Sequence, residues 1–585
     1  ATLSVVDLLV DDDLTVAGAT VFNGGFASNA SSTITTADNL SVLTLISTDA
    51  DANSGPTLSL FRNSANPADN DFAGLIAFNS ENSADESIRM GMIRSQVLDV
   101  TDGTEDSKLA FYSRQGGVEV ETIALVSGSI TTPTAGTSNF RAGVNAGNSI
   151  ASGGNFNTVV GDEAGTAITT GDSNVIVGMI AGDALTTASD NIAVGQGALT
   201  TDTLGSKTVA IGRQALTTQN FTTATDTYNV AVGYQAGLSV TTGIQNILIG
   251  GLAGDALTDA DRNVVIGQGA LTTDTLGSNA TAIGSFALST QNFTTATANY
   301  NTAVGYQAGV AVTTGIENVL IGGLAGDALT DADFNVAVGK NTLTADTLGS
   351  KSTAIGQNAL ATQNFTTATD TFNVAVGFGA GGAVTTGTLN TYIGGKAGST
   401  SNTAGNNVAV GYDSLALNTK GSKNVAVGES ALYTFNVTTA TDTFNTAVGH
   451  HAGVSVTTGV QNTLIGGLAG DAQTTGVRSV FVGYKAGSAV TTGDSNVAVG
   501  WQALMTEDAN SNNTAIGASA LQTLNAGASG FNTAAGFEAG KAMTTGVQNT
   551  LIGGLAGNAL TDADFNVAIG INALVVDTLG SKSVA

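Results

Sequence analysis

A glycine recurs at a fixed spacing along most of this chain, and the repeat that it marks limits the fold more than any other feature. Residues 229–245, NVAVGYQAGLSVTTGIQ, show one copy around Gly233. The same slot recurs 24 times from Gly161 to Gly570, in steps of 17, 17, 17 and 21 residues that form a 72-residue superrepeat until the cycle changes after Gly449. Such a period, sustained over most of a chain, is typical of a solenoid, in which each repeat stacks on its neighbours. We call each copy a rung and this glycine its anchor glycine.

Each rung contains a short β-strand directly before its anchor glycine. The residue three positions before the glycine is Val, Ile or Thr in all 24 copies, and the residue one position before it is Val or Ile in 23. β-branched residues two positions apart point to the same face of a strand. The residue between them is usually Ala, so both faces are apolar, as in buried parallel sheets. The sequence therefore predicts an all-β protein whose main part is a parallel β-solenoid, or β-roll, of 24 rungs.

An asparagine stands four positions before the anchor glycine in 20 of the 24 copies. In rungs stacked about 4.8 Å apart, these amides are able to hydrogen-bond to one another along the axis of the rod. We therefore predict a structural asparagine ladder rather than a set of ligand-binding residues.

Side-chain size is correlated at two positions of the rung. Where the residue in the middle of the strand is large, the residue after the anchor glycine is Gly, in the pairs Leu248/Gly251, Leu320/Gly323, Tyr392/Gly395, Leu464/Gly467 and Leu551/Gly554. We interpret this correlation as one crowded interface, between chains or between adjacent rungs. A coil of 17 residues encloses little volume, so an oligomer around a common axis is expected. At about 4.8 Å per rung, the rod is on the order of 115 Å long.

Composition excludes several classes of function. The chain has 18 basic and 46 acidic residues and a net charge of −28, which is the wrong sign for binding nucleic acid. It has no cysteine, which excludes disulfides and thiolate metal sites. No window approaches the run of about 18 apolar residues that a membrane-spanning helix needs, so we expect no membrane insertion.

The chain divides into four segments that differ in composition and in sequence pattern. Residues 1–47 carry short β-type runs and are predicted to serve attachment or trimerisation, whereas residues 128–156 are rich in Gly, Ser and Thr and read as a linker or as the first irregular turns of the rod. Residues 48–127 are predicted to form a small antiparallel β domain of five strands, at 57–62, 73–79, 87–100, 108–114 and 118–126. Residues 157–585 are the rod. Because the next anchor glycine would fall beyond Ala585, we expect the rod to continue past this end.

The repeat block N-V-A-V-G-x-x-A, with its Gly-containing turns, resembles the repeats in the heads of trimeric autotransporter adhesins. That resemblance implies a left-handed β-roll assembled as a homotrimer. Residues 55–127, which include GPTLSLFRNSANPADNDFAGLIAFN and VLDVTDGTEDSKLAFYSR, resemble a domain of bacteriophage tail-fibre proteins, notably marine ones. The stretch DDDLTVAGATVFNG near the start is similar to the segments that open such fibres. Neither resemblance brings catalytic residues.

Together these observations predict a structural fibre protein of a phage tail, located on the virion tail or otherwise extracellular. Its expected partners are two further copies of itself, other tail or baseplate proteins at the N-terminal end, and a host surface receptor or glycan. Two alternatives stay open: a bacterial trimeric surface adhesin or secreted filament subunit, and a glycan-depolymerising tail spike. Glycan cleavage needs a carboxylate pair in an irregular site, which near-identical rungs do not supply. We therefore expect neither enzymatic activity nor a cofactor, with Ca²⁺ as the one candidate ion.

The long rungs of the superrepeat insert four residues, and each of these loops carries two aromatic side chains. The pairs are Phe221 and Tyr228, Phe293 and Tyr300, Phe365 and Phe372, and Phe435 and Phe444. Exposed aromatic rings are able to stack on sugar faces, which makes the loops candidate host contacts. The alternative is that each pair packs against its own loop or against the next chain.

Two further sets of residues are candidate sites. Acidic turns hold one carboxylate trio at Asp255, Asp259 and Asp261 and another at Asp327, Asp331 and Asp333. Clustered carboxylate oxygens suit Ca²⁺, although solvated acidic turns are the alternative. The slot after the anchor glycine is aromatic or His at Tyr234, Tyr306, Phe378, Tyr412, His450, Tyr484, Trp501 and Phe537. We interpret this second set as packing in a groove between chains.

Overall fold

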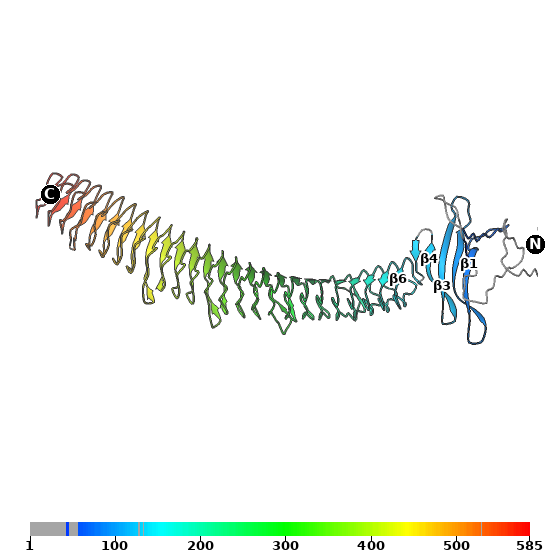
Figure 1. Ribbon diagram of the computed structural model, residues 1–585. Coiled ribbons are helices and arrows are strands. Elements are labelled where there is room, and N and C mark those ends of the chain that lie inside the picture. Colours follow the sequence, from blue (N-terminus) through cyan, green and yellow to red (C-terminus); the bar gives the residue numbers. More distant parts are fainter. Residues whose placement is uncertain (1–42, 46–56, 127–128, 133, 528) are drawn as a thin grey trace, which may run out of the picture. The chain divides into compact units, whose positions relative to one another are not determined.

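The computed structural model describes residues 43–45, 57–126, 129–132, 134–527 and 529–585, and it contains strands and turns but no helix in these ranges. The chain divides into two compact units, Ala1–Ser129 and Ile130–Ala585. Figure 1 shows long strands in the first unit and a row of stacked short strands in the second. Most of the predicted segment 1–47 lies outside the described residues.

The first unit contains an antiparallel sheet in the order β1-β2-β3-β4. Its strands are β1 (Phe72–Glu81), β2 (Ser87–Asp99), β3 (Asp106–Gln115) and β4 (Val118–Val126), and the short β5 (Ser129–Thr131) spans the boundary between the two units. The antiparallel sheet and four of its five predicted strands are therefore confirmed. The predicted strand at 57–62 is wrong, because this stretch has no regular structure and its Leu58, Leu60 and Phe61 side chains are exposed.

The second unit is a parallel β-solenoid with about 25 turns at the 17-residue spacing, as predicted. Each turn contributes one three-residue strand that pairs in register with the strands of the turns before and after it, as Val230↔Ile247 in β13 and β14 shows. The ladder runs through β6 (Phe140–Ala142), β7 (Thr158–Val160), β8 (Val175–Val177), β9 (Ile192–Val194), β11 (Val209–Ile211), β13 (Val230–Val232), β14 (Ile247–Ile249), β15 (Val264–Ile266), β17 (Thr281–Ile283), β19 (Thr302–Val304), β20 (Val319–Ile321), β21 (Val336–Val338), β23 (Thr353–Ile355), β25 (Val374–Val376), β26 (Thr391–Ile393), β27 (Val408–Val410), β29 (Val425–Val427), β31 (Thr446–Val448), β32 (Thr463–Ile465), β33 (Val480–Val482), β34 (Val497–Val499), β35 (Thr514–Ile516), β36 (Thr533–Ala535), β37 (Thr550–Ile552) and β38 (Val567–Ile569).

The count of 24 rungs is one short, because β6 pairs in register with β7. β6 lies in residues 128–156, so of the two readings of that segment the structure supports the first irregular turns of the rod. This first rung has Phe140, Arg141 and Ala142 at the three strand positions and Gly143 as its anchor glycine. None of the three strand residues matches the consensus of the later rungs, so the pattern of β-branched residues did not reveal it. The solenoid therefore already includes part of residues 128–156.

The anchor glycine turns the chain at the end of each strand. Gly233 has φ +147°, and a Cβ placed there would lie 2.3 Å from the carbonyl oxygen of Gly250 in the next rung. Only glycine combines this backbone conformation with so close an approach of two rungs. The steric demand explains why the anchor is invariant along the rod.

The asparagine ladder is confirmed. The backbone N–H of Asn174 donates to Oδ1 of Asn157 at 3.0 Å, and the Asn174 side-chain amide donates to the same oxygen at 3.0 Å. The same amide also donates to the carbonyl oxygen of Ala188 at 3.0 Å. These asparagines are fully buried or nearly so, so each one satisfies backbone groups that water does not reach.

The middle residue of each strand points into the coil and its two β-branched neighbours point outward. Ala231 and Leu248 are 0% exposed, whereas Ile247 and Ile249 are 38% and 36% exposed. The expectation that both strand faces are buried is therefore correct for the inner face only, as far as a single chain is concerned.

Inside the coil, the fourth residue after the anchor glycine packs against the middle residue of the strand. This fourth residue is buried both where it is Gly237 and where it is Leu216. A Cβ on Gly237 would lie 2.6 Å from Cδ1 of Leu248. The large mid-strand residue is thus accommodated by Gly237 and not by Gly251, so the interpretation of Leu248 and Gly251 as one crowded interface is wrong.

A buried carboxylate in the interior predicts a local dependence of stability on pH. Glu507 is 0% exposed, its Oε2 has no partner among the described groups, and burial raises its pKa to about 6. The pKa of Glu507 is higher in the folded chain than in the unfolded chain. The free energy of unfolding therefore decreases as the pH rises from the unfolded pKa to the folded pKa of about 6, and it stays low above that pH. At pH 8, Glu507→Gln is expected to stabilise this rung by about 2 kcal/mol, with little effect at pH 4.

Hydrogen exchange of the amides in this rung, corrected for the intrinsic rate at each pH, measures the effect. Gln473 occupies the equivalent position of another rung, so glutamine fits the interior. An equal change in protection at both pH values would contradict the buried, unpaired carboxylate.

Candidate interaction surfaces

One long side of the solenoid is covered by β-branched side chains in two columns. They are the residues three and one positions before each anchor glycine, and we call this surface the β-branched face. Every residue in it from Thr158 to Ile569 is Val, Ile, Thr or the single Ala535, so no charged side chain interrupts it. Most of its isoleucines are exposed in the single chain, from Ile192 at 36% to Ile569 at 60%, whereas Ile266 and Ile283 are half-buried.

The β-branched face is large enough for a stable interface. At about 4.8 Å per rung and about 3.3 Å per residue, the face of the three-residue strands along the rod covers about 1,100 Å². Specific interfaces bury roughly 800 Å² per partner, and an apolar patch above a few hundred Å² usually marks an interaction site. In a chain with a net charge of −28, a continuous uncharged surface of this size identifies the side of the rod best suited to contact other chains.

The position after each anchor glycine forms a column of mixed side chains beside this face, in which an aromatic ring or His is followed on the next rung by a glycine at Tyr234/Gly251, Tyr306/Gly323, Phe378/Gly395, His450/Gly467 and Phe537/Gly554. Tyr306 is 56% exposed, and the next rung places Gly323 beside it, where the N–H of Leu324 donates to the Tyr306 carbonyl oxygen at 2.9 Å. Nothing lies within 4 Å of a Cβ built on Gly323, and this glycine lacks the positive φ of the anchor. Neither backbone conformation nor packing inside the chain requires glycine there. The column thus presents exposed rings next to hollows, which supports the predicted packing between chains without testing it.

Alanine substitutions at the neighbouring glycines Gly322 and Gly323 are expected to have opposite effects on the stability of the rung. Gly322→Ala is expected to destabilise its rung by at least ~2 kcal/mol, because Gly322 has φ +136° and its Cβ would lie 2.4 Å from the Gly339 oxygen. Gly323→Ala is expected to leave the rung unchanged or to stabilise it by ~0.5 kcal/mol. Hydrogen exchange at residues 319–324 measures both, and comparable destabilisation by the two variants would contradict the assignment of the hollow.

The structure separates the two aromatics of each long loop. Phe221, Phe293 and Phe365 are 6% exposed and Phe435 is 0% exposed, so the first member of each pair packs in the rod and is not available as a host contact. The second members remain about half exposed; they are Tyr228, Tyr300, Phe372 and Phe444. The alternative of packing against the loop is therefore correct for the first member, and host contact stays a prediction for the second.

Each long loop adds a pair of two-residue parallel strands outside the main ladder. The pairs are β10 (Gly205–Ser206) with β12 (Thr225–Asp226), β16 (Gly277–Ser278) with β18 (Thr297–Ala298), β22 (Gly349–Ser350) with β24 (Thr369–Asp370), and β28 (Gly421–Ser422) with β30 (Thr441–Asp442).

Three of the four exposed loop rings lie beside a lysine and an aspartate. Lys207 Nζ lies 2.5 Å from Asp226 Oδ2 and 5.3 Å from the centre of the Tyr228 ring, and the hydrogen bond to Asp226 raises the pKa of Lys207. The same arrangement recurs around Phe372 and Phe444, whereas Asn279 and Ala298 replace the ion pair near Tyr300. Three of the four loops therefore present an aromatic ring with both a donor and an acceptor next to it.

The carboxylates of the acidic turns do not converge into a cluster in the structure, and calcium binding by them stays a prediction. Asp255 accepts a hydrogen bond from Thr272, Asp259 from Thr242 at 2.7 Å, and Asp261 from the backbone N–H of Ile244 at 2.9 Å. Asp327, Asp331 and Asp333 bond in the same way to Thr344, Thr314 and Ile316. These bonds to other rungs hold the carboxylates apart. In the described part of the chain, the one trio of His, Cys, Asp or Glu side chains with ligand atoms within 4.8 Å lies elsewhere.

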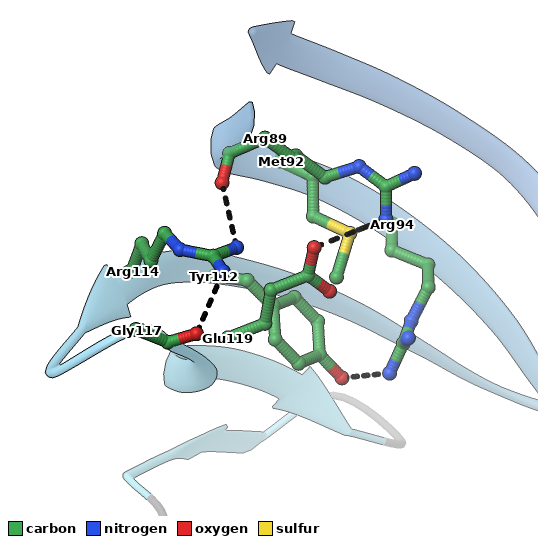
Figure 2. A network of polar contacts seen from close by, with 7 residues as sticks. All are labelled: Arg89, Met92, Arg94, Tyr112, Arg114, Gly117 and Glu119. Atoms are coloured by element: carbon green, nitrogen blue, oxygen red, sulfur yellow. Dashed lines mark hydrogen bonds and ion pairs between the residues drawn. The ribbon is translucent and has the colours of Figure 1, made fainter. Parts of the chain in front are cut away.

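The sheet of the first unit has one polar and one apolar face. On the polar face, the Arg94 guanidinium lies 4.3 Å from the Phe72 ring centre and 4.2 Å from that of Tyr112. Figure 2 shows Arg94 next to Tyr112, and Arg89 paired with Glu119 at 3.3 Å. The strand register places a row of apolar side chains on the other face, namely Ile76, Ile93, Phe111 and Ile123. Buried apolar side chains in the described part of this unit are limited to Met92, Ala110 and Ala124, so the sheet leaves most of its apolar surface uncovered.

Comparison with protein-family models, curated proteins and solved structures finds no match. In the residues that the structure describes, no helix is long and apolar enough to cross a membrane.

The sequence predicted the positions of the two β-branched columns, but it did not predict that the strand face that carries them is exposed in the single chain. The signal was available in the size of the residues, because the interior position alternates between Ala and bulky residues such as Leu248 and Tyr392, whereas the outer positions are uniformly β-branched. Uniform size is what a flat contact surface requires.

Proposed function

We propose that the chain is the shaft of a homotrimeric fibre of a phage tail, located on the virion tail and therefore outside the host cell. Three copies lie parallel around a common axis with their β-branched faces turned inward. The observation that carries the proposal is the uncharged β-branched face, which continues along the whole ladder from β7 to β38. A stiff rod with a ladder of hydrogen bonds along its axis serves as a spacer between the virion and the host surface.

The first unit is proposed as the end that faces the virion and its tail or baseplate proteins. Its uncovered apolar face, with Phe78 and Leu125 exposed, supports assembly with further copies or with a neighbouring protein. The tail context rests on the resemblance of residues 55–127 to tail-fibre sequences. Host surface glycans or receptors are proposed to meet the exposed loop residues Tyr228, Tyr300, Phe372 and Phe444.

Immunogold electron microscopy tests this location. Antibodies raised against residues 157–585 are applied to virus particles and to uninfected cells from the same culture. The proposal expects gold particles on the tails of virions and none on uninfected cells. Label on the surface of uninfected cells, with unlabelled virions, would support a bacterial surface adhesin and contradict the tail assignment.

A further inference from the structure

Three side chains with metal-binding groups meet on one stretch of the rod surface. Nε2 of His450 lies 3.7 Å from Oε2 of Glu429, and the rings of His450 and His451 stack with their centres 3.9 Å apart. One ligand atom from each of the three side chains lies within 4.8 Å of those of the other two. These are the only two histidines in the chain, and both are in this group.

The backbone ladder fixes the positions from which the three side chains project. Glu429 follows the anchor glycine of one rung, and His450 and His451 follow the anchor glycine of the next. The N–H of His451 donates to the Glu429 carbonyl oxygen at 3.0 Å, and the N–H of Leu468 in the following rung donates to the His450 carbonyl oxygen at 2.9 Å. The side chains themselves are free to reorient, since those of His450 and Glu429 are 57% and 56% exposed.

The superrepeat supplies an internal comparison for these positions. The same backbone hydrogen bond joins Gln235 to Arg213, Gln307 to Ser285 and Gly379 to Gln357, so these are the structural equivalents of His451 and Glu429. The equivalents of His450 are Tyr234, Tyr306 and Phe378. In three superrepeats this place therefore holds no group suited to a transition metal, and in the fourth all three residues are ligand types at once.

If the position of His450 simply tolerated different side chains, that tolerance would explain the histidine at this one position. It does not explain the simultaneous presence of a second imidazole at His451 and a carboxylate at Glu429, which are separated by 22 residues in the sequence but lie on adjacent rungs. The neighbouring Asp471 adds negative charge within electrostatic reach of His451, and its Oδ1 is buried without a hydrogen-bond partner among the described groups. Lys485 also interacts with Asp471 and offsets part of this charge.

We propose that Glu429, His450 and His451 form a binding site for a divalent transition-metal ion of the Zn²⁺ class. Two imidazole nitrogens and one carboxylate oxygen are a common ligand set for Zn²⁺, Ni²⁺ and Cu²⁺, and water fills the remaining positions. The bound ion links two consecutive rungs through their side chains, in addition to the backbone ladder. One chain contributes all three ligands, so the site needs no residue from a neighbouring chain.

Calorimetric titration of the full chain with Zn²⁺, in excess Mg²⁺ to occupy the exposed carboxylates, tests the site. The superrepeat provides the matched variant: Glu429→Gln, His450→Tyr and His451→Gln together install residues that equivalent rungs carry at Gln357, Tyr306 and Gln307, so this chain is expected to fold. We expect one Zn²⁺ per wild-type chain and loss of that site in the triple variant.

A transplant tests whether the three residues suffice. Ser285→Glu, Tyr306→His and Gln307→His reproduce the group two superrepeats earlier, and the stoichiometry is expected to rise from one to two Zn²⁺ per chain. Circular dichroism of each variant verifies the fold. Wild-type protein that binds no more Zn²⁺ than the triple variant, or a folded transplant without a second site, would overturn the proposal.

Discussion

Replacing Val264, Val336 and Val408 with aspartate is expected to separate the proposed trimer into single folded chains. The three residues occupy the same column of the β-branched face, one superrepeat apart, and each is only half-buried in the isolated chain. Water therefore still reaches an aspartate at these positions in the monomer, at a cost of ~1 kcal/mol or less in strand propensity. In the trimer each carboxylate is buried without a partner, which costs about 3–5 kcal/mol per site. Sedimentation velocity measures the loss of the three-chain species.

The control replaces the same three valines with threonine. Threonine already stands in this column at Thr302 and Thr353, so it keeps the shape of the face and adds no charge. The threonine variant is expected to sediment like the wild type. If the aspartate variant also retains the mass of the wild type, with unchanged circular dichroism, then the β-branched face is not the interface.

Asn318→Leu is expected to open the rod locally while leaving distant rungs intact. Oδ1 of Asn318 accepts the N–H of Asn335 at 3.0 Å, and its amide donates to the Ala332 oxygen at 2.8 Å. Leucine leaves both buried groups unpaired, at about 1–3 kcal/mol each. Because a solenoid is held together by contacts between neighbours, the loss is concentrated in the adjacent rungs. Hydrogen exchange at Asn335 is expected to accelerate by roughly 30-fold or more.

Asn318→Ser is the matched control, because the serine hydroxyl is able to accept from the next rung. Ser479 does so for the N–H of Asn496, at 3.4 Å. We expect the serine variant to lose less protection than the leucine variant. Equal exchange rates in both variants would show that packing, and not the amide ladder, holds the rungs together at this position.

The repeats explain why so much of the rod could be predicted from one sequence. Twenty-four copies of a slot act as an internal alignment, so a position that tolerates only Gly, such as Gly233, or mostly Asn, such as Asn246, reveals its structural role. The first rung was not predicted because its strand residues Phe140, Arg141 and Ala142 do not match the consensus of the later strands. The exposure of the outer strand face was missed because alanine and valine are both apolar, and the variation in size at the position of Ala231 was not used as the sign of an interior position.

The candidate sites were less predictable because they depend on side-chain direction. Phe221 and Tyr228 lie in one loop and have similar chemistry, yet the first is buried and the second exposed. The aspartates of the acidic turns are close in sequence, but Asp259 and Asp261 bond to different residues of another rung. The group at Glu429 and His450 brings together residues 21 positions apart, a relation that becomes visible only when adjacent rungs are superimposed.

Sedimentation equilibrium of the purified chain tests directly whether three copies assemble. We predict a single species with three times the 57.8 kDa mass of the chain, stable to dilution because the β-branched faces are buried against one another along the rod. A species with the mass of one chain, folded by circular dichroism and unchanged across protein concentrations, would contradict it.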